Sequence, residues 1–158
     1  MRFLPVGVVN DPAVIAKNHA MVSLNGALSV DLFGQLVADT IDGRQYSGIG
    51  GHEDFLAGIG VSEAGRSLVC LPATYRAGGG RRSRIVPRLP AGAVVTSPRH
   101  QVDVVVTEFG AAELFGCTVG ERARALAELA HPDEREALRA AAREIDRLGV
   151  AEPAAGPA

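Results

Sequence analysis

The sequence predicts one α/β domain, and three observations support this class. The first half of the 158-residue chain alternates short branched-aliphatic runs with glycine and asparagine, a pattern typical of strands joined by tight turns. A continuous apolar run at 67–71 predicts a buried strand. The last third repeats alanine and leucine at helical spacing. We therefore expect one domain over residues 1–149, with a disordered tail at 150–158.

The first elements are predicted to be a strand, a short helix and two extended segments. Val6–Val9 is expected to be a buried strand. Asp11 and Pro12 predict a helix from Pro12 to Lys17, because Asp accepts free backbone donors and Pro suits the first helical position. Extended segments follow within 21–30 and 31–38, with a turn at 31–35. The glycine-rich stretch 42–51 is expected to lack regular structure.

The second half predicts further strands and two helices. A loop rich in glycine and arginine should follow the strand at 67–71, and strands are expected at 93–96 and 102–107. Thr118 and Glu121 form the pattern of a capping box, which predicts a helix start. A second helix should follow Pro132 and end at Gly149.

The net charge of −2 conceals an uneven distribution. Residues 67–102 carry six arginines and no acidic residue, so a local anion-binding surface is expected, whereas the net charge argues against a nucleic-acid-binding surface over the whole protein. The two cysteines and four histidines lack metal-ligand spacing, so we expect no metal. No apolar run approaches the roughly 20 residues of a membrane helix and no secretory signal is visible, which predicts no membrane association and a cytoplasmic location.

Two loops and four carboxylates, those of Glu53, Glu63, Glu108 and Glu113, could carry chemistry. The glycines of Ser47–Gly51 allow backbone N–H groups to form an oxyanion hole, although a tight turn is the commoner explanation. The arginines between Pro72 and Arg84 favour, in order, a solvated basic loop, a phosphate site and a single-stranded RNA site, for which only Tyr75 offers stacking. Glu108, after the strand at 102–107, is either a base of raised pKa or a structural partner.

Several motifs resemble the carboxyl-terminal domain of the acetyl-CoA hydrolase/transferase family, part of the class I CoA-transferases. They follow the family's order from about Val6 to about Leu138. The motifs are Asn10-Asp11-Pro12, Met21-Val22-Ser23-Leu24-Asn25, Asp31-Leu32-Phe33-Gly34-Gln35, Ser47-Gly48-Ile49-Gly50-Gly51, Ser83-Arg84-Ile85-Val86-Pro87 and Val105-Val106-Thr107-Glu108-Phe109-Gly110. The resemblance implies an α/β fold with a mostly parallel open sheet and flanking helices.

The resemblance implies CoA transfer between an acyl-CoA and acetate or a similar carboxylate, or acyl-CoA hydrolysis, through a glutamyl-CoA thioester. It places Asn10 and Gly51 at the oxyanion. It also implies that Arg76, Gly50, Gly78 and Gly79 contact CoA, which is a substrate and not a tightly bound cofactor.

The family's catalytic glutamate lies before the region that aligns with Asn10, so we expect this chain to lack it. Glu108 and Glu113 match positions that are not the nucleophile, and Ser29 stands where a glutamate is common. The expected function is the carboxyl-terminal half of a CoA-transferase, which needs an amino-terminal partner subunit or is inactive alone. The alternative is a noncatalytic protein that binds CoA, nucleotides or RNA with its arginine-glycine loop.

Overall fold

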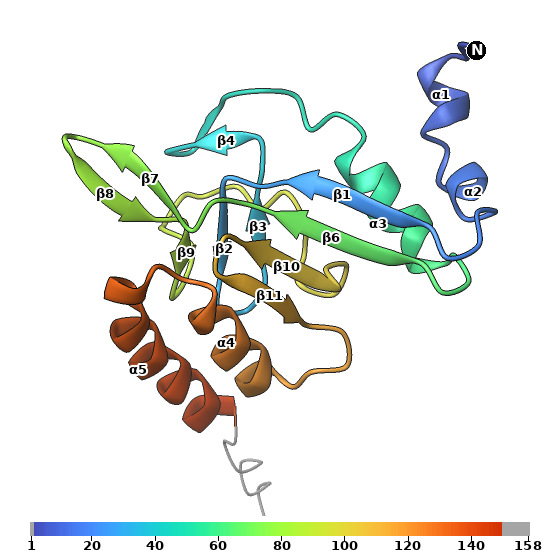
Figure 1. Ribbon diagram of the computed structural model, residues 1–158. Helices are drawn as coiled ribbons and strands as arrows, with labels where there is room; N and C mark the ends of the chain where they lie inside the picture. Colours follow the sequence, from blue (N-terminus) through green and yellow to red (C-terminus); the bar gives the residue numbers. More distant parts are fainter. Residues whose placement is uncertain (1, 150–158) are drawn as a thin grey trace, which may run out of the picture.

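A computed structural model describes residues 2–149 and shows a mixed α/β fold around a four-stranded sheet (Figure 1). The strand order is β1-β6-β10-β11. The first three strands are parallel and β11 is antiparallel, which confirms the predicted mostly parallel sheet. The strands are β1 (Val22–Gly26), β6 (Arg66–Cys70), β10 (Val104–Thr107) and β11 (Gly110–Glu113).

A smaller sheet and two hairpins surround the central sheet. The smaller sheet has the order β3-β2-β9, from β2 (Ser29–Asp31), β3 (Leu36–Val37) and β9 (Ile85–Val86). The hairpins are β4 (Thr40–Ile41) with β5 (Arg44–Gln45), and β7 (Thr74–Ala77) with β8 (Gly80–Ser83). The expected turn after Asp31 is confirmed: its Oδ1 accepts the N–H groups of Phe33 and Gln35 at 3.0 and 2.9 Å.

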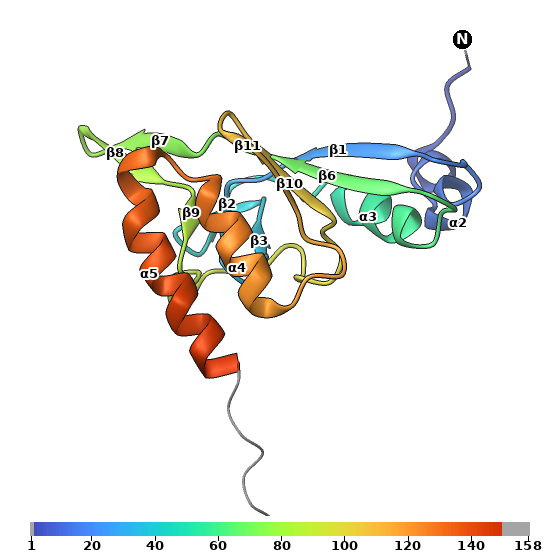
Figure 2. The same ribbon diagram turned by 60° about the horizontal axis from the view of Figure 1, so that its bottom comes forward.

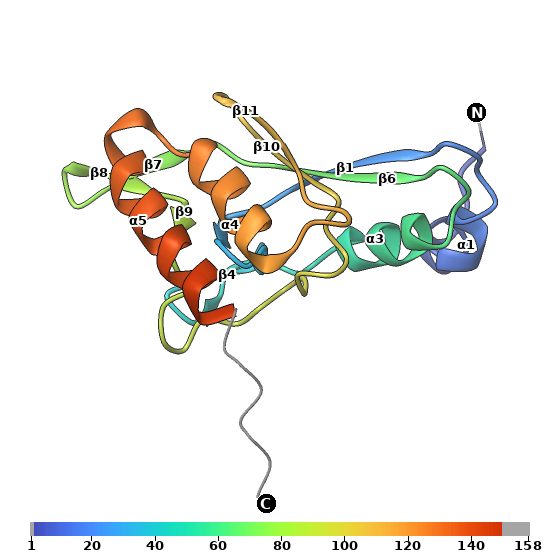
Figure 3. The same cartoon turned by 90° about the horizontal axis from the view of Figure 1, so that it is seen from below.

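The described residues form five helices, and the longer ones lie against one side of the central sheet (Figures 2 and 3). They are α1 (Val6–Val9), α2 (Pro12–Ile15), α3 (His52–Gly60), α4 (Val119–Glu128) and α5 (Pro132–Gly149). Helix α3 packs on β1 and β6, while α4 lies between β11 and α5. The buried core joins the inward side of the sheet to α3, α4 and α5.

The helix starts follow the predicted cap chemistry. Asp11 accepts the N–H of Ala13 at 2.8 Å at the start of α2. At the start of α4, Thr118 Oγ1 accepts the Glu121 N–H at 3.3 Å and a Glu121 carboxylate oxygen accepts the Thr118 N–H at 2.8 Å. Both bonds satisfy backbone donors that a helix leaves free at its first turn.

Four secondary-structure predictions were wrong. Val6–Val9 is the exposed helix α1, because Asn10 N–H donates to Val6 O at 2.8 Å and no described strand lies beside it. The segment 93–96 forms no strand, and only a single bridge joins Leu36 to Ser97. The stretch 42–51 contains β5, and the arginine-glycine loop is the hairpin β7–β8. The sequence predicted no helix at α3 and no strand at β11.

Two predictions concern the carboxyl-terminal tail and membrane-spanning helices. Residues 150–158, where we expect a disordered tail, lie outside the described residues. Within residues 2–149, no helix combines the length and apolar character that crossing a bilayer requires.

Candidate functional site

Asn10 and Gly51 lie against each other, although different segments carry them. Asn10 is the residue after α1 and Gly51 is the residue before α3. A methyl group placed on Gly51 would overlap the Asn10 side-chain nitrogen and lie 3.5 Å from the Phe55 ring. Only glycine therefore leaves room for the Asn10 amide at this position. The fold thus brings together the two residues that the resemblance assigns to the oxyanion.

Hydrogen bonds at both ends hold Asn10 in this position. Its backbone N–H donates to Val6 O at 2.8 Å, and its Nδ2 donates to Asp54 Oδ2 at 3.3 Å in the first turn of α3. The amide nitrogen has two N–H groups, so one remains for another acceptor. Asp54 therefore orients an amide donor beside the glycine bend.

The glycine bend offers backbone donors next to this amide. Gly50 has a φ of +62°, which favours glycine, and a methyl group built on it would meet nothing within 4 Å. Within the described residues, the N–H groups of Gly50 and Gly51 donate to no backbone or side-chain acceptor. Free N–H groups and an amide side chain can together donate hydrogen bonds to the negative oxygen of a tetrahedral intermediate.

A polar network holds the start of α3 in place. His52 is buried, and its Nε2 lies 4.0 Å from a Glu53 carboxylate oxygen. Burial lowers the pKa of His52, although the charges of Glu53 and Asp39 oppose this effect. Glu53 also accepts a hydrogen bond from the buried Ser97 hydroxyl.

Asp39 is a further member of this polar network, because its charge acts on His52. It accepts the Thr96 hydroxyl at 2.6 Å and the Gln45 amide at 2.9 Å, and these hydrogen bonds lower the pKa of Asp39. The backbone oxygen of Asp39 accepts the N–H groups of Tyr46 and Ser47 at 2.8 and 3.1 Å. The segment that leads into the glycine bend is therefore anchored at its beginning as well as at α3.

Arg76, Gly78 and Gly79 lie in the β7–β8 hairpin, at the end of the molecule away from α1 and α2 in all three views (Figures 1–3). Both glycines have positive φ, +59° and +75°, as a two-residue turn of this type requires. Arg76 is exposed and pairs across the hairpin with Arg81. The structure therefore does not place Arg76 beside Asn10 and Gly51.

A hollow of about 390 Å³ lies at the base of this hairpin. Arg84 lines it and lies 4.9 Å from the Tyr75 ring, while one Arg84 Nη donates to Leu28 O at 2.6 Å. The Arg84 Nε is buried and has no acceptor among the described residues. The hollow thus combines an arginine, a tyrosine and apolar walls.

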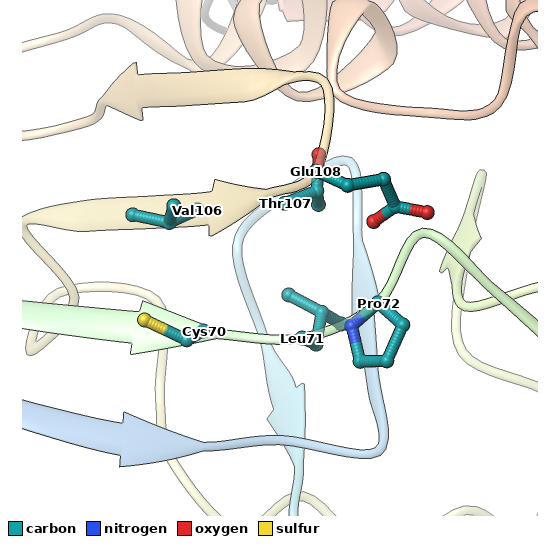
Figure 4. Close-up of a pocket in the computed structure, with 6 residues that line it drawn as sticks. All are labelled: Cys70, Leu71, Pro72, Val106, Thr107 and Glu108. Atoms are coloured by element: carbon teal, nitrogen blue, oxygen red, sulfur yellow. The ribbon is translucent and has the colours of Figure 1, made fainter.

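A second hollow, of about 590 Å³, lies at the carboxyl ends of β6 and β10 (Figure 4). Its lining residues are Cys70, Leu71, Pro72, Val106, Thr107 and Glu108. A Glu108 carboxylate oxygen accepts the Ala73 N–H at 2.8 Å, so this side chain fixes the segment after β6. This contact agrees with the structural role expected for Glu108 from the resemblance. Crevices at the carboxyl ends of parallel strands are common ligand sites.

The mostly parallel α/β fold is that of a CoA-transferase domain, because it aligns with the crystal structure of a 4-hydroxybutyrate CoA-transferase from Porphyromonas gingivalis at a TM-score of 0.69 and 41% identity, covering 92% of this chain and 31% of that chain. The family model described as "Acetyl-CoA hydrolase/transferase C-terminal domain" matches residues 1–142. The chain belongs to this family.

Relatives with known names and structures support this assignment. The chain is 49% identical over 133 residues to a 4-hydroxybutyrate coenzyme A transferase of Clostridium kluyveri, covering 84% of this chain and 30% of that protein. It is 46% identical to a succinyl-CoA:cyclohexane-1-carboxylate CoA transferase of Geobacter metallireducens, covering 91% and 32%. The crystal structure of RipA from Yersinia pestis aligns with a TM-score of 0.78 and 44% identity, covering 90% and 31%. The chain thus spans about a third of the length of these relatives.

The sequence did not predict the contacts that support the glycine bend, although Glu53 was a candidate carboxylate. His52, Glu53 and Ser97 join two segments that are far apart in the chain, and their residue types are common in loops. Glu53 stood next to the glycine motif, but nothing in the local sequence pointed to Ser97 as its partner. Only the bridge between Leu36 and Ser97 in the folded chain places that hydroxyl beneath α3.

Proposed function

We propose that this chain is the carboxyl-terminal part of a CoA-transferase and supplies the oxyanion side of its active site. The nucleophilic glutamate would come from an amino-terminal portion, either on the same polypeptide or on a separate subunit. The observation that carries this proposal is the contact between Asn10 and Gly51, two residues that the family resemblance assigns to one site. Without its partner portion, this chain should not transfer CoA.

The proposed chemistry places these donors at each tetrahedral stage. A glutamate carboxylate attacks the acyl-CoA carbonyl, whose oxygen becomes negative, and collapse of this intermediate releases CoA thiolate and leaves an anhydride. The thiolate attacks the glutamyl carbonyl of the anhydride, which forms glutamyl-CoA and frees the first carboxylate. An acceptor carboxylate then reverses both steps. Asn10 Nδ2 and the N–H of Gly51 would stabilise the oxyanions, and one such donor contributes about 10²–10³ in kcat.

The hairpin would act on a different part of the substrate. An exposed guanidinium at Arg76 suits the phosphate groups of CoA, and the glycines at 78 and 79 let the backbone approach closely. Because the hairpin lies away from the glycine bend, Gly50 and Arg76 would contact CoA at separate points. Coenzyme A would thus be a substrate that extends between two regions of the protein.

A chimera tests this proposal. The matched region of the Clostridium kluyveri transferase is replaced with residues 6–142 of this chain, and acetate-dependent CoA transfer is assayed for the chimera and for this chain alone. We expect turnover from the chimera only. Asn10→Ala should reduce kcat about 100-fold, as expected for one oxyanion donor. Asn18→Ala is the matched control, because the Asn18 side-chain amide donates only to carbonyl oxygens of α2. Turnover by this chain alone, or full activity of the Asn10 variant, would contradict the proposal.

One observation favours a second function, that of a noncatalytic anion-binding protein. The hairpin pairs Arg76 with Arg81 and Tyr75 with Arg82. Arg81 forms an ion pair with Asp133, so Arg76 on β7 and Arg82 on β8 supply the positive charge for an anion. Binding of CoA and of single-stranded RNA would be compared between 50 and 200 mM salt. RNA affinity that falls about 10³-fold or more over this range would favour this function, because neutralised phosphates release counterions.

A further inference from the structure

In the described part of the chain, helices cover one face of the central sheet and leave the other face uncovered. Directly paired residues in neighbouring strands point to the same face, so the register assigns each side chain. One face carries a set of buried residues, Ser23, Ser67, Val69, Val105, Thr107 and Ala112, together with the half-buried Asn25 and the exposed Gly110 at the edge of the turn. Figures 2 and 3 show α3 and α4 on that side. Among residues 2–149, no helix lies over the opposite face in these views.

The uncovered face is apolar over most of its extent. We call six of its residues the open face: Val22, Leu24, Leu68, Cys70, Val106 and Ala111. The register places four more residues on this face, which are Gly26, the buried Val104, and Arg66 and Glu113, whose ion pair lies where β6 begins and β11 ends. None of the six is buried, and the Leu24 side chain is 70% exposed. At the carboxyl ends of β6 and β10, the open face continues into the hollow of about 590 Å³ shown in Figure 4. Such a contiguous apolar surface is typical of an interaction site.

Strand β1 strengthens this interpretation because it is the edge of the sheet. Its outer side presents unpaired backbone groups, and its five residues include no proline and no charged residue to block pairing. Predominantly parallel sheets are covered on both faces in folded proteins. Both the edge and the open face therefore require further protein.

The amino-terminal portion of a CoA-transferase is the occupant that fits. The relatives are about three times longer than the region matched here, and the family model describes a carboxyl-terminal domain, so their additional chain precedes this region. Residues 2–5 rise from α1 on the side of the sheet that carries the open face (Figure 2). Phe3 in this segment is 85% exposed.

We propose that the open face and the edge of β1 are the docking surface for the amino-terminal portion of a CoA-transferase. This inference rests on the proposed function, because it takes its occupant from there. Docking would bring the catalytic portion over the carboxyl ends of β6 and β10. The 590 Å³ hollow would then be closed from outside by the partner portion.

Cysteine labelling tests the docking surface directly. Cys70 lies on the open face, whereas Cys117 lies in the connection between β11 and α4, and both are free and partly exposed. The rates of maleimide labelling at the two positions are measured by peptide mapping in this chain alone and in the chimera. Because thiol reaction requires access, docking should slow labelling of Cys70 at least about tenfold and change that of Cys117 less than about twofold. Equal Cys70 rates in the two proteins would overturn the inference.

A substitution within the face adds a second readout. Leu24→Lys should raise the Cys70 labelling rate of the chimera toward that of the isolated chain, because a charge would be buried on docking. Val61→Lys is the control, since Val61 is similarly exposed, at 74%, and lies at the end of α3. Equal effects of the two variants would count against the docking surface.

The isolated chain gives a measurement that does not depend on the chimera's folding. A dye that binds exposed apolar surface should bind this chain, and the double variant Val22→Lys, Leu24→Lys should lose at least about half of the signal, because these side chains dominate the exposed patch. An unchanged signal would contradict the open face. A chimera that protects Cys70 but transfers no CoA would leave the docking surface standing and refute the proposed function.

Discussion

Two glycine clusters look alike in the sequence and differ in what they require. At the start of α3, Gly51 is needed for space, because the Asn10 amide occupies the volume that a methyl group would take. In the β7–β8 hairpin, Gly78 and Gly79 have nothing within 4 Å of a built methyl group, so within the described residues the fold requires glycine there only for its positive φ. Glycine therefore supports a tight contact in one region and a tight turn in the other.

This difference distinguishes a glycine that shapes the proposed site from glycines that shape only a turn. A close contact between a side chain and a backbone bend fixes the relative position of two donors, which is what stabilisation of an oxyanion requires. A turn fixes only the path of the chain. We expect substitutions at Gly51 to alter function more than stability, and those in the hairpin turn to do the opposite.

The largest expected effect is that of Gly51→Ala on activity. The new methyl group would displace the Asn10 side chain, and CoA transfer by the chimera should fall about 100-fold. Stability should change by less than about 1 kcal/mol, because the end of a side chain can move aside. In an Asn10→Ala background, the same substitution should cost little further activity. Additive losses in the double variant would show that the two residues act separately.

The next effect is on the packing beneath this region. A methyl group on Gly58 would overlap the Ile15 side chain and lie 3.0 Å from Pro12 O, so Gly58→Ala should destabilise the fold by about 1–3 kcal/mol. Gly60→Ala in the same helix meets no atom within 4 Å and should cause no loss. Denaturant unfolding of the two variants measures the difference. Equal stability would mean that α2 does not pack tightly on α3.

The sequence predicted the elements whose signals are local. The capping box at Thr118, the cap at Asp11 and the apolar run at 67–71 each determine structure through neighbours a few residues away, and the structure confirms all three. The order of motifs also predicted the family and the parallel sheet.

Elements that depend on distant neighbours were missed. The branched residues of Val6–Val9 favour a strand, but a strand needs a partner, and this segment forms helix α1. Helix α3 contains two glycines near its end, which weakened its local signal. The contact between Asn10 and Gly51 was expected only through the family resemblance, because no local pattern specifies it.

A smaller effect is expected in the hairpin turn. Gly79 has a φ of +75°, so Gly79→Ala should cost about 1 kcal/mol through backbone strain, while Gly79→Asn should cost less because Asn tolerates this conformation. Thermal unfolding measures both variants. CoA transfer by the chimera should fall less than with Gly51→Ala. A larger loss of activity in the hairpin variant would reverse the comparison between the two clusters.

The smallest expected effect is the pH dependence of the glycine-bend region. Burial lowers the pKa of His52 below its ordinary value of 6.5, so the unfolded chain binds a proton at a higher pH than the folded chain does. The free energy of unfolding should therefore be unaffected by the titration of His52 above pH 6.5. It should fall as the pH drops from 6.5 toward the lowered folded-state pKa. His52→Gln removes this titration. The difference in unfolding free energy between the two proteins should be constant above pH 6.5. Below pH 6.5 the native chain should lose stability relative to His52→Gln. A difference that stays flat across the whole range would mean that His52 is free to take up its proton in the folded protein, and that the start of α3 is open to water.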